Sequence, residues 1–319
     1  MFFGIGLCPS PGGTVYSIDF HADDYASSPE NSRRILALAQ AGRVDSFSVI
    51  TNMGCYAACM QMLRESWAGL PRKPLLSVHL NLIDGFWLSS ENSGKIIQNA
   101  WGGIFFQGLL PGRKRDRLRQ AFSAEIEAQI LAFQAQTRGL TDEAGAPLAL
   151  RIDSHVHTHM IPLVFQALMD ALNRMGLREQ VRFIRCSTEP LSMFLLTPGI
   201  AGTIAPVNLI KNLMLHVLSH SVRKKLNAMR IPTGRIFGVA MTGEMDLKRV
   251  SLLLPKMAAY AKKKDAYLEV LSHPGRVLSS ELCDEYGPDD RKAFLSPKRD
   301  VEYQMLMALP DQPSFQKLK

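Results

Sequence analysis

Residues 15–25 read VYSIDFHADDY, and this stretch decides the fold. Its first six residues, VYSIDF, are mostly apolar, β-branched or aromatic, which predicts a buried β-strand. The strand leads directly into HADDY, where a histidine and two adjacent aspartates follow it. Charged side chains are rare beside a buried strand unless they are paired or functional. We therefore expect this strand to end at a polar site.

Strands and helices alternate through the rest of the chain. Short β-branched runs separated by longer helical patterns predict parallel strands with helical crossovers, in a barrel or a doubly wound sheet. Further strands are expected at 46–51, 75–82, 148–154, 181–186, 236–241 and 267–272. Helices are expected at 30–41, 55–65, 121–136 and 163–175, the first with Ser27 or Ser28 as N-cap. The pattern predicts an α/β fold with about seven strands.

A single domain, 1–319, is expected for the whole chain. The hydrophobic content of 46% is enough for a large core and excludes a disordered or collagen-like protein. The sequence shows neither an internal repeat nor a low-complexity linker that would divide it. Segments 83–119 and 188–235 do not fit the alternation, and we predict that they are insertions over one end of a barrel.

Cysteine usage and the first residues favour a cytoplasmic protein. Five cysteines without a CxxC pair argue against a disulfide framework and a zinc ribbon. Residues 1–13 have no basic region and only a short apolar run, unlike a signal peptide. Residues 190–210 carry no charge, but their three prolines argue against a membrane-spanning helix. They are expected to form a buried or lid-like loop that leads into a helix near Val207.

The formal net charge is +8 at pH 7. Much of the excess lies in 113–119, 223–230, 262–264 and 291–299, which we expect to lie away from the polar site. The basic helix 211–230 is a candidate for peripheral contact with an anionic membrane. A nucleic-acid partner is not expected, because no RNA-binding motif accompanies the basic residues.

Polar clusters follow four of the predicted strands. Besides HADDY, they are His79 in the third strand, DSHVHTH at 153–159, and His273 before a Pro-Gly turn. Six of the eight histidines belong to these clusters. Because the carboxyl ends of parallel barrel strands meet at one face, the four clusters are expected to converge there.

Two imidazoles and a carboxylate form a common shell for a divalent metal with open positions. Successive side chains on an extended chain diverge, so one of Asp23 and Asp24 can bind the metal while the other faces a metal-bound water. That arrangement suits metal-assisted hydrolysis. His155 is nearest to its strand end and is the expected ligand. His157 and His159 share its face if the segment is extended, and they line the pocket or support the ligands.

The four clusters together resemble the YdjC-like carbohydrate deacetylases, which include chitooligosaccharide deacetylases and a hopanoid-biosynthesis-associated branch. The matching motifs are ADDY at 22–25, SVHLNL at 77–82, DSHVHTH at 153–159 and EVLSHPG at 269–275. The resemblance covers residue 15 to about residue 275. Ala26 and Ser77 stand where the family more often has glycine.

The resemblance implies a distorted (β/α) TIM-like barrel similar to that of polysaccharide deacetylases. It also implies hydrolytic removal of an acetyl group from an N-acetylated amino sugar, in an oligosaccharide or a glycolipid, with one divalent ion, Mg²⁺ or Zn²⁺. The implied roles are Asp23 as general base, His273 as general acid, and Asp24, His79 and His155 as metal ligands. His157 and Arg185, the latter at the end of the strand VRFIR, are expected to contact the substrate.

Two other functions stay open at this point. The HVH triplet at 155–157 is also typical of metal-dependent phosphoesterases and amidohydrolases, although those folds usually have it after the first strand. A non-catalytic barrel that binds carbohydrate or nucleic acid is the other alternative, with 211–230 and 262–264 as its basic surfaces. The oligomeric state is open, and a homodimer is one alternative.

Overall fold

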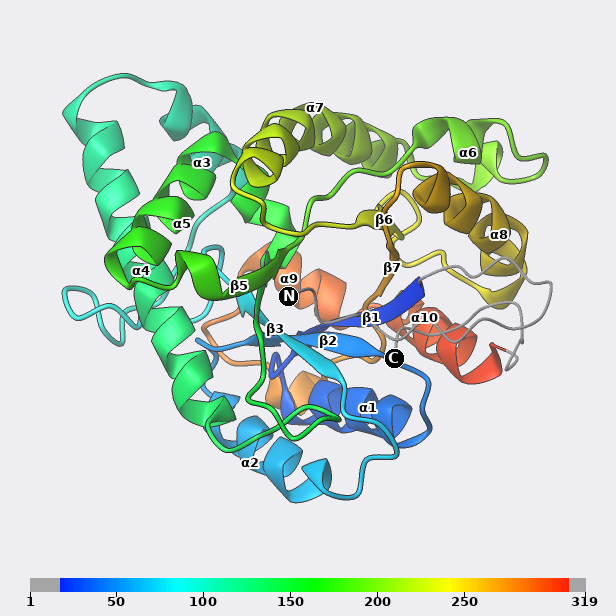
Figure 1. Cartoon of the computed structure of the whole chain (residues 1–319), viewed down its shortest axis with the longest axis horizontal. Coiled ribbons are helices and arrows are strands. Elements are labelled where there is room, and N and C mark those ends of the chain that lie inside the picture. The colour runs from blue at the N-terminus through cyan, green and yellow to red at the C-terminus, as the bar shows by residue number, and fades with distance from the viewer. Residues whose placement is uncertain (1–17, 310–319) are drawn as a thin grey trace.

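The computed structural model describes residues 18–309 and contains one sheet of seven parallel strands (Figure 1). The strands are β1 (Ile18–Tyr25), β2 (Ser46–Ile50), β3 (Leu75–Leu80), β4 (Leu150–Ser154), β5 (Val181–Ile184), β6 (Arg235–Phe237) and β7 (Leu268–Ser272). Their spatial order is β5-β4-β3-β2-β1-β7-β6. The first and last strands in sequence are therefore neighbours, as in a barrel. The predicted α/β barrel-like fold is confirmed.

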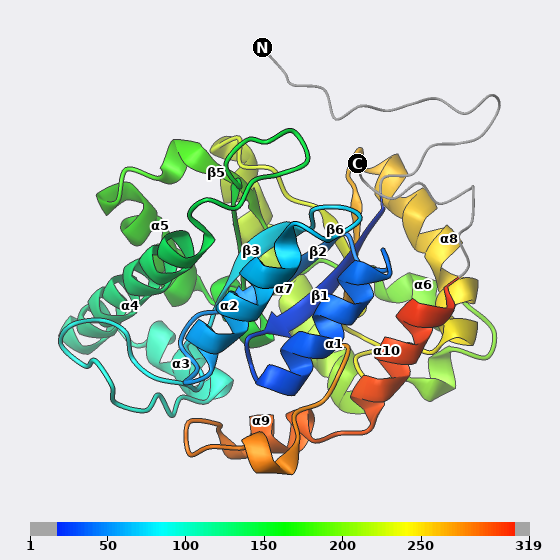
Figure 2. The same ribbon diagram turned by 90° about the horizontal axis from the view of Figure 1, so that it is seen from below.

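Helices cover the outside of the curled sheet (Figures 1 and 2). They are α1 (Pro29–Gln40), α2 (Tyr56–Trp67), α3 (Trp101–Leu109), α4 (Arg113–Thr137), α5 (Pro162–Arg174), α6 (Leu191–Leu195), α7 (Pro206–Ala228), α8 (Leu247–Lys263), α9 (Pro288–Phe294) and α10 (Lys298–Ala308). Short 3₁₀ turns are η1 (His155–Met160), η2 (Arg178–Gln180), η3 (Ala201–Thr203) and η4 (Ser279–Glu281). No helix within 18–309 is long and apolar enough to cross a membrane.

The alternation of β1 explains how the sheet separates core from site. Ile18, Phe20 and Ala22 are buried in the hydrophobic core. The residues that alternate with them, Asp19, His21 and Asp23, are also buried but polar. Successive side chains of a strand point to opposite faces, so one face of β1 packs apolar side chains while the other carries ionisable groups. The inside of the curled sheet is therefore a polar interior.

The two edges of the sheet approach each other. The amide of Ile184 in β5 donates to the carbonyl of Pro232 at 3.2 Å. The amide of Ile236 in β6 donates to the carbonyl of Thr188 at 3.4 Å. These two bonds hold the curled sheet together where β5 and β6 do not form a regular ladder.

Glu189 adds a second connection at this seam. Its carboxylate accepts from the amides of Gly238 at 2.6 Å and Ala240 at 2.7 Å, and from the side chain of Asn212 in α7. Burial raises the pKa of Glu189 to about 7 against these favourable hydrogen bonds. The chain after β5 is thereby linked both to α7 and to the chain after β6.

Several element boundaries differ from those expected. β1 continues through the aspartates to Tyr25, so the pair lies within the strand, and residues 15–17 fall outside the described part. The helix expected at 121–136 begins at Arg113. β6 has three residues, and Gly238 follows it with a φ of +138°, where a Cβ would lie 2.3 Å from the Leu271 carbonyl oxygen. The predicted cap of α1 is confirmed, since Ser28 accepts from the amide of Asn31 at 3.1 Å.

The two segments that did not fit the alternation contain helices. Segment 83–119 holds an isolated antiparallel bridge, α3 and the start of α4. The uncharged residues 190–210 were expected to form a loop, and instead they contain α6, η3 and the first turn of α7. The proline at position 206 is favourable at the beginning of a helix, because its fixed φ suits the first turn.

Candidate metal centre and active site

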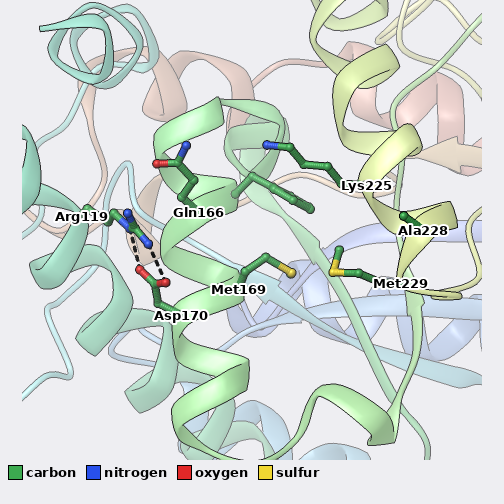
Figure 3. A pocket seen from close by; sticks show the side chains of 8 residues that line it. Arg119, Gln166, Met169, Asp170, Lys225, Ala228 and Met229 are labelled. Atoms are coloured by element: carbon green, nitrogen blue, oxygen red, sulfur yellow. Dashed lines mark hydrogen bonds and ion pairs between the residues drawn. The ribbon is translucent and has the colours of Figure 1, made fainter. Parts of the chain in front are cut away.

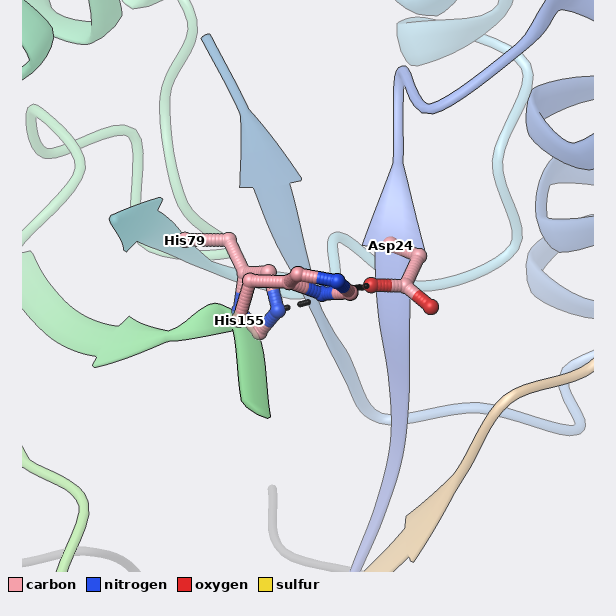
Figure 4. A group of neighbouring side chains, drawn as sticks. All are labelled: Asp24, His79 and His155. Carbon is pink, nitrogen blue, oxygen red and sulfur yellow. Dashed lines mark hydrogen bonds and ion pairs between the residues drawn. The ribbon is translucent and has the colours of Figure 1, made fainter. Parts of the chain in front are cut away.

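Asp24, His79 and His155 lie together at the carboxyl ends of the strands (Figure 4). Asp24 comes from β1, His79 from β3, and His155 directly follows β4. One potential ligand atom from each lies within 4.8 Å of the others. Asp24 Oδ1 is 3.0 Å from His155 Nδ1 and 3.5 Å from His79 Nε2. The structure thus brings together the three predicted metal ligands, all of them buried.

A local distortion of β1 directs Asp24 toward the two histidines. The pairing register with β2 shifts between Ala22 and Tyr25, which marks a bulge. Asp24 has a φ of +71° and Ala26 a φ of +67°. Such left-handed conformations are strained for residues with a side chain, by about 1–3 kcal/mol each. The positive φ of Ala26 explains why glycine is the easier residue there.

The condition under which the three histidines of DSHVHTH would share one face, an extended segment, is not met. The segment is not extended but forms η1, with Val156 at a φ of +44° and His157 at +58°. His155 joins the ligand group, whereas His157 Nδ1 lies 3.0 Å from Ser187 Oγ. His159 Nε2 lies 2.9 Å from the carbonyl oxygen of Arg185, so its ring braces the chain behind the site.

Each candidate histidine ligand has a carboxylate on its other ring nitrogen. His79 Nδ1 is 2.6 Å from Asp153 Oδ1, and His155 Nε2 is 3.1 Å from Asp290 Oδ1. Carboxylates in this position fix the orientation and tautomer of metal-binding imidazoles. Asp153 belongs to a predicted cluster. Asp290 lies in α9 beyond all the motifs and was missed, because nothing in its local sequence distinguishes it from a surface aspartate.

Asp23, the neighbour of Asp24, is held by Arg185. Two guanidinium nitrogens of Arg185 donate to the two carboxylate oxygens of Asp23, at 2.8 and 2.9 Å. Ser48 Oγ donates to Asp23 Oδ1 at 2.8 Å. The Asp23 Oδ2 atom also lies 4.0 Å from His79 Nε2. Asp24 Oδ1 lies 3.5 Å from the same nitrogen, so both carboxylates approach His79, whereas Arg185 holds only Asp23. The division of roles between the two aspartates stays a prediction.

Arg185 lies beneath the site and has almost no accessible surface. Its side chain is 1% exposed, and besides Asp23 its Nε atom donates to Glu269 Oε1 at 2.6 Å. A further contact of 3.1 Å joins it to Asp153 Oδ2. The guanidinium is enclosed by three carboxylates and presents no free face to a sugar, contrary to the contact expected from the sequence.

His273 is the most accessible of the predicted site residues, since all the others are buried. Its side chain is 20% exposed, and its Nε2 atom lies 3.9 Å from Asp23 Oδ2. Glu302 of α10 holds it from the other side, because the carboxylate accepts from the His273 amide at 2.5 Å and lies 3.5 Å from its Nδ1. The following Pro-Gly turn is closely packed. A Cβ on Gly275 would lie 2.8 Å from Arg34 Cδ.

The charges of the site reinforce one another. Burial alone would raise the pKa of Asp23, but Arg185 and His79 hold it well below its usual range. Burial alone would lower the pKa of His79, but the carboxylates Asp23 and Asp153 raise it to about 9. The pKa of His155 is likewise raised by Asp290 and Asp24, which outweigh its burial. A cation is therefore favoured among these groups, either as protons on the imidazoles or as a metal ion.

The pKa of His157 is shifted in the opposite direction to those of His79 and His155. Burial, together with the positive charges of Lys211 and Arg185, holds its pKa well below the usual range. It is 4% exposed and therefore a neutral, buried imidazole. The same holds for His159, whose burial lowers its pKa to about 4.

Arg299 of α10 forms an ion pair with Asp24 Oδ2. Its Nη1 atom also donates to the Gly275 carbonyl at 3.2 Å. The expectation that the basic segment 291–299 lies away from the polar site is thus wrong. Figure 2 shows why, since α9 and α10 follow the last strand and return to the end of the barrel where β1 finishes. Asp24 Oδ1 is left to face the histidines.

A separate surface pocket of about 290 Å³ lies between α4, α5 and α7 (Figure 3). Its lining includes the ion pair between Arg119 and Asp170, and the apolar side chains of Met169 and Met229. The Lys225 Nζ atom lies over the Phe165 ring, 5.6 Å from the ring centre. None of the predicted site residues lines this pocket, so it is distinct from the candidate metal centre.

Comparison with known proteins identifies the family. A family model described as YdjC-like protein matches residues 17–310. The chain belongs to this family. The YdjC-like assignment covers every residue of the ligand group and of its carboxylate supports. No curated protein matches the chain with significance.

One solved structure supports the fold of this YdjC-like protein, and others align more weakly. A protein from Enterococcus faecalis, provisionally described as a cellobiose-phosphate cleavage protein, aligns with a TM-score of 0.57 at 15% identity, over 92% of each chain. A β-mannanase from Bacteroides ovatus aligns with a TM-score of 0.43 at 12% identity, over 95% of this chain and 91% of that one. An endo-β-1,4-mannanase from Cellulomonas fimi gives 0.42 at 11%, over 95% and 72%.

Proposed function

We propose that this protein is a metal-dependent hydrolase that removes the acetyl group from an N-acetylated amino sugar. The observation that carries the proposal is that a group of candidate metal ligands and a separate carboxylate lie side by side in one buried site. One is the ligand group Asp24, His79 and His155, and the other is the ionised carboxylate of Asp23 beside it. Membership of the YdjC-like family supports a carbohydrate as the substrate.

The donor set fits a divalent ion. It combines one carboxylate oxygen with two imidazole nitrogens, and both imidazoles have a carboxylate behind them. Three protein ligands leave positions for water and substrate, as in hydrolytic metal sites. Imidazoles suit Zn²⁺, whereas a carboxylate and water also admit Mg²⁺. When bound, such an ion polarises the amide carbonyl and makes water more acidic.

Asp23 is positioned to accept a proton from the attacking water. Its Oδ2 atom is about equally far from His79 Nε2 and His273 Nε2, at 4.0 and 3.9 Å. Its low pKa keeps it ionised at neutral pH, so that a lone pair is available. Arg185 holds the carboxylate plane through two hydrogen bonds, and we assign this residue a positioning role instead of the expected substrate contact.

His273 is positioned to protonate the departing amine. A general acid has to reach both the reacting centre and solvent, and His273 combines proximity to Asp23 with partial exposure. Glu302 holds its backbone amide and faces its Nδ1 atom, which orients Nε2 toward Asp23. His157 lies deeper and is neutral, and in this proposal it borders the acetyl end of the substrate.

The reaction itself is tested by a screen for acetate release. The purified protein is incubated with Zn²⁺, Mg²⁺ or Mn²⁺ and with N-acetylglucosamine, chitooligosaccharides or lipid-linked N-acetylamino sugars. We expect equimolar acetate and free amine from at least one sugar, and no release after chelation. Turnover of a phosphate ester without acetate release from any sugar would instead favour the phosphoesterase alternative.

Metal binding tests the ligand group separately from catalysis. His79→Ala is expected to abolish stoichiometric binding of the ion, because it removes one of three protein donors. Asp290→Asn is expected to weaken the affinity about 10- to 100-fold, the usual effect of losing the group that orients a ligand. The matched control is Asp289→Asn, since Asp289 is the exposed neighbour of Asp290. Affinities are measured by titration calorimetry, and an unchanged His79→Ala affinity would remove His79 from the ligand group.

A further inference from the structure

The outward face of α7 is apolar, although it is exposed. Val207, Ile210, Leu213 and Val217 are between 57% and 69% exposed. Their spacing of three and four residues places them on one face of the helix. The buried residues Leu215, Ser219, Val222 and Leu226 lie on the opposite face, against the protein. A surface helix normally has charged or polar residues on its outward face, so α7 is unusual.

The neighbouring helices extend this apolar surface. Leu196, directly after α6, is 79% exposed, and α6 packs against α7. Phe106 and Leu109 of α3 are 67% and 62% exposed. In Figure 1 the helices α3, α7 and α6 lie along the same upper side of the molecule, with α5 contacting both α3 and α7. We call the exposed apolar side chains of α3, α6 and α7 the apolar rim.

Positive charge predominates beside the apolar rim. Residues 190–243, which include α6 and α7, contain no aspartate or glutamate. Residues 92–115, which include α3, contain none either. Exposed cations border the rim, with Lys224 on α7 and Arg113 and Lys114 at the start of α4, where Asp116 is the one exposed carboxylate of the first turn. Exposed apolar side chains beside an excess of cations match the acyl boundary and headgroups of an anionic bilayer.

The rim begins at the same end of the barrel as the site. Helix α7 packs against η1, which contains His155 of the ligand group, and the half-buried Lys211 lies in the second turn of α7. Contact at this side of the molecule would therefore bring the barrel mouth close to the surface that is bound. A second copy of the chain is a poor occupant, because it would oppose one positive rim to another.

We propose that the apolar rim binds the surface of an anionic phospholipid bilayer and holds the protein there as a peripheral membrane protein. The side chains of α7 and α6 enter the boundary between headgroups and acyl chains, and the bordering cations contact the anionic headgroups. This inference concerns where the protein binds and does not depend on the reaction proposed above.

The test is co-sedimentation of the full chain with vesicles. We expect binding to vesicles of equal phosphatidylglycerol and phosphatidylcholine, and at least about tenfold weaker binding to pure phosphatidylcholine or in high salt. The double variant Ile210→Asp with Leu213→Asp is expected to bind the anionic vesicles at least about tenfold more weakly than the wild-type chain. The matched control is Leu131→Asp on α4, because Leu131 is 57% exposed but lies outside the rim.

Thermal unfolding of each variant serves as the folding control, since all three positions are exposed and the midpoint should not change. Failure of the wild-type chain to bind anionic vesicles would overturn the proposal. Equal binding by the double variant and by wild type would also overturn it. A concentration-dependent dimer that the double variant abolishes, without vesicle binding, would show that the rim is occupied by a second copy. If the protein binds vesicles but releases no acetate from any sugar, the proposed reaction is contradicted, whereas the membrane-binding role of the apolar rim is supported.

Discussion

Asp23→Asn is expected to lower the rate of acetate release by at least about a hundredfold, and by up to about ten-thousandfold, which is the range for loss of a general base. The substitution retains the size of the side chain but removes the carboxylate that faces both His79 and His273. The affinity for the divalent ion should change little, because Asp24 and the two histidines supply the predicted ligands. The measurement compares kcat and the metal dissociation constant of the same preparation.

The control for this variant is Asp24→Asn, which is adjacent in sequence but belongs to the ligand group. It should lose metal and activity together, whereas Asp23→Asn should lose activity alone. The reverse pattern would exchange the roles of the two aspartates. Equal activity of Asp23→Asn and wild type at saturating metal would exclude Asp23 as the base.

Arg185→Met is expected to lower the free energy of unfolding by about 3–5 kcal/mol, the usual consequence of removing one partner from a buried ionic group. The variant leaves Asp23, Glu269 and Asp153 buried without the cation that contacts all three. Arg185→Lys should be less destabilising, because it retains the charge but not the planar pair of donors that holds Asp23. Urea denaturation at neutral pH measures the differences.

Arg182, in β5 just before Arg185, provides a matched control. Its side chain is exposed, and it donates to the carbonyl of Glu179 on the surface. Arg182→Met should change the unfolding free energy by no more than about 0.5 kcal/mol. Similar effects at both positions would show that Arg185 is not the central cation of the site.

The sequence contained most of the information on the fold because its strands carry strong local signals. β1 alternates Ile18, Phe20 and Ala22 with polar residues, and this pattern alone separates the packed face from the polar face. His79 and Asp24 could also be identified, since polar residues at the ends of buried strands have few structural explanations. Parallel topology then places them at one end of the sheet.

The remaining contacts of the site could not be inferred in this way. Asp290, Arg299 and Glu302 come from helices beyond the last strand, and their sequence resembles that of any solvated helix. Their positions depend on how α9 and α10 return to the mouth, which is a tertiary property. The conformation of η1 was missed for a different reason. Positive φ at Val156 and His157 is disfavoured locally and exists only because the surrounding structure imposes it.

The contact between Arg299 and Asp24 joins residues separated by nearly the whole described chain. Within residues 18–309, Asp24 belongs to the first strand, β1, and Arg299 to the last helix, α10. A nascent chain that has formed its sheet but not α10 therefore holds Asp24 without this partner. The surroundings of the Asp24 carboxylate are therefore complete only once α10 has packed at the end of the barrel, and a fragment truncated before α10 would lack the Arg299 ion pair at the candidate metal centre.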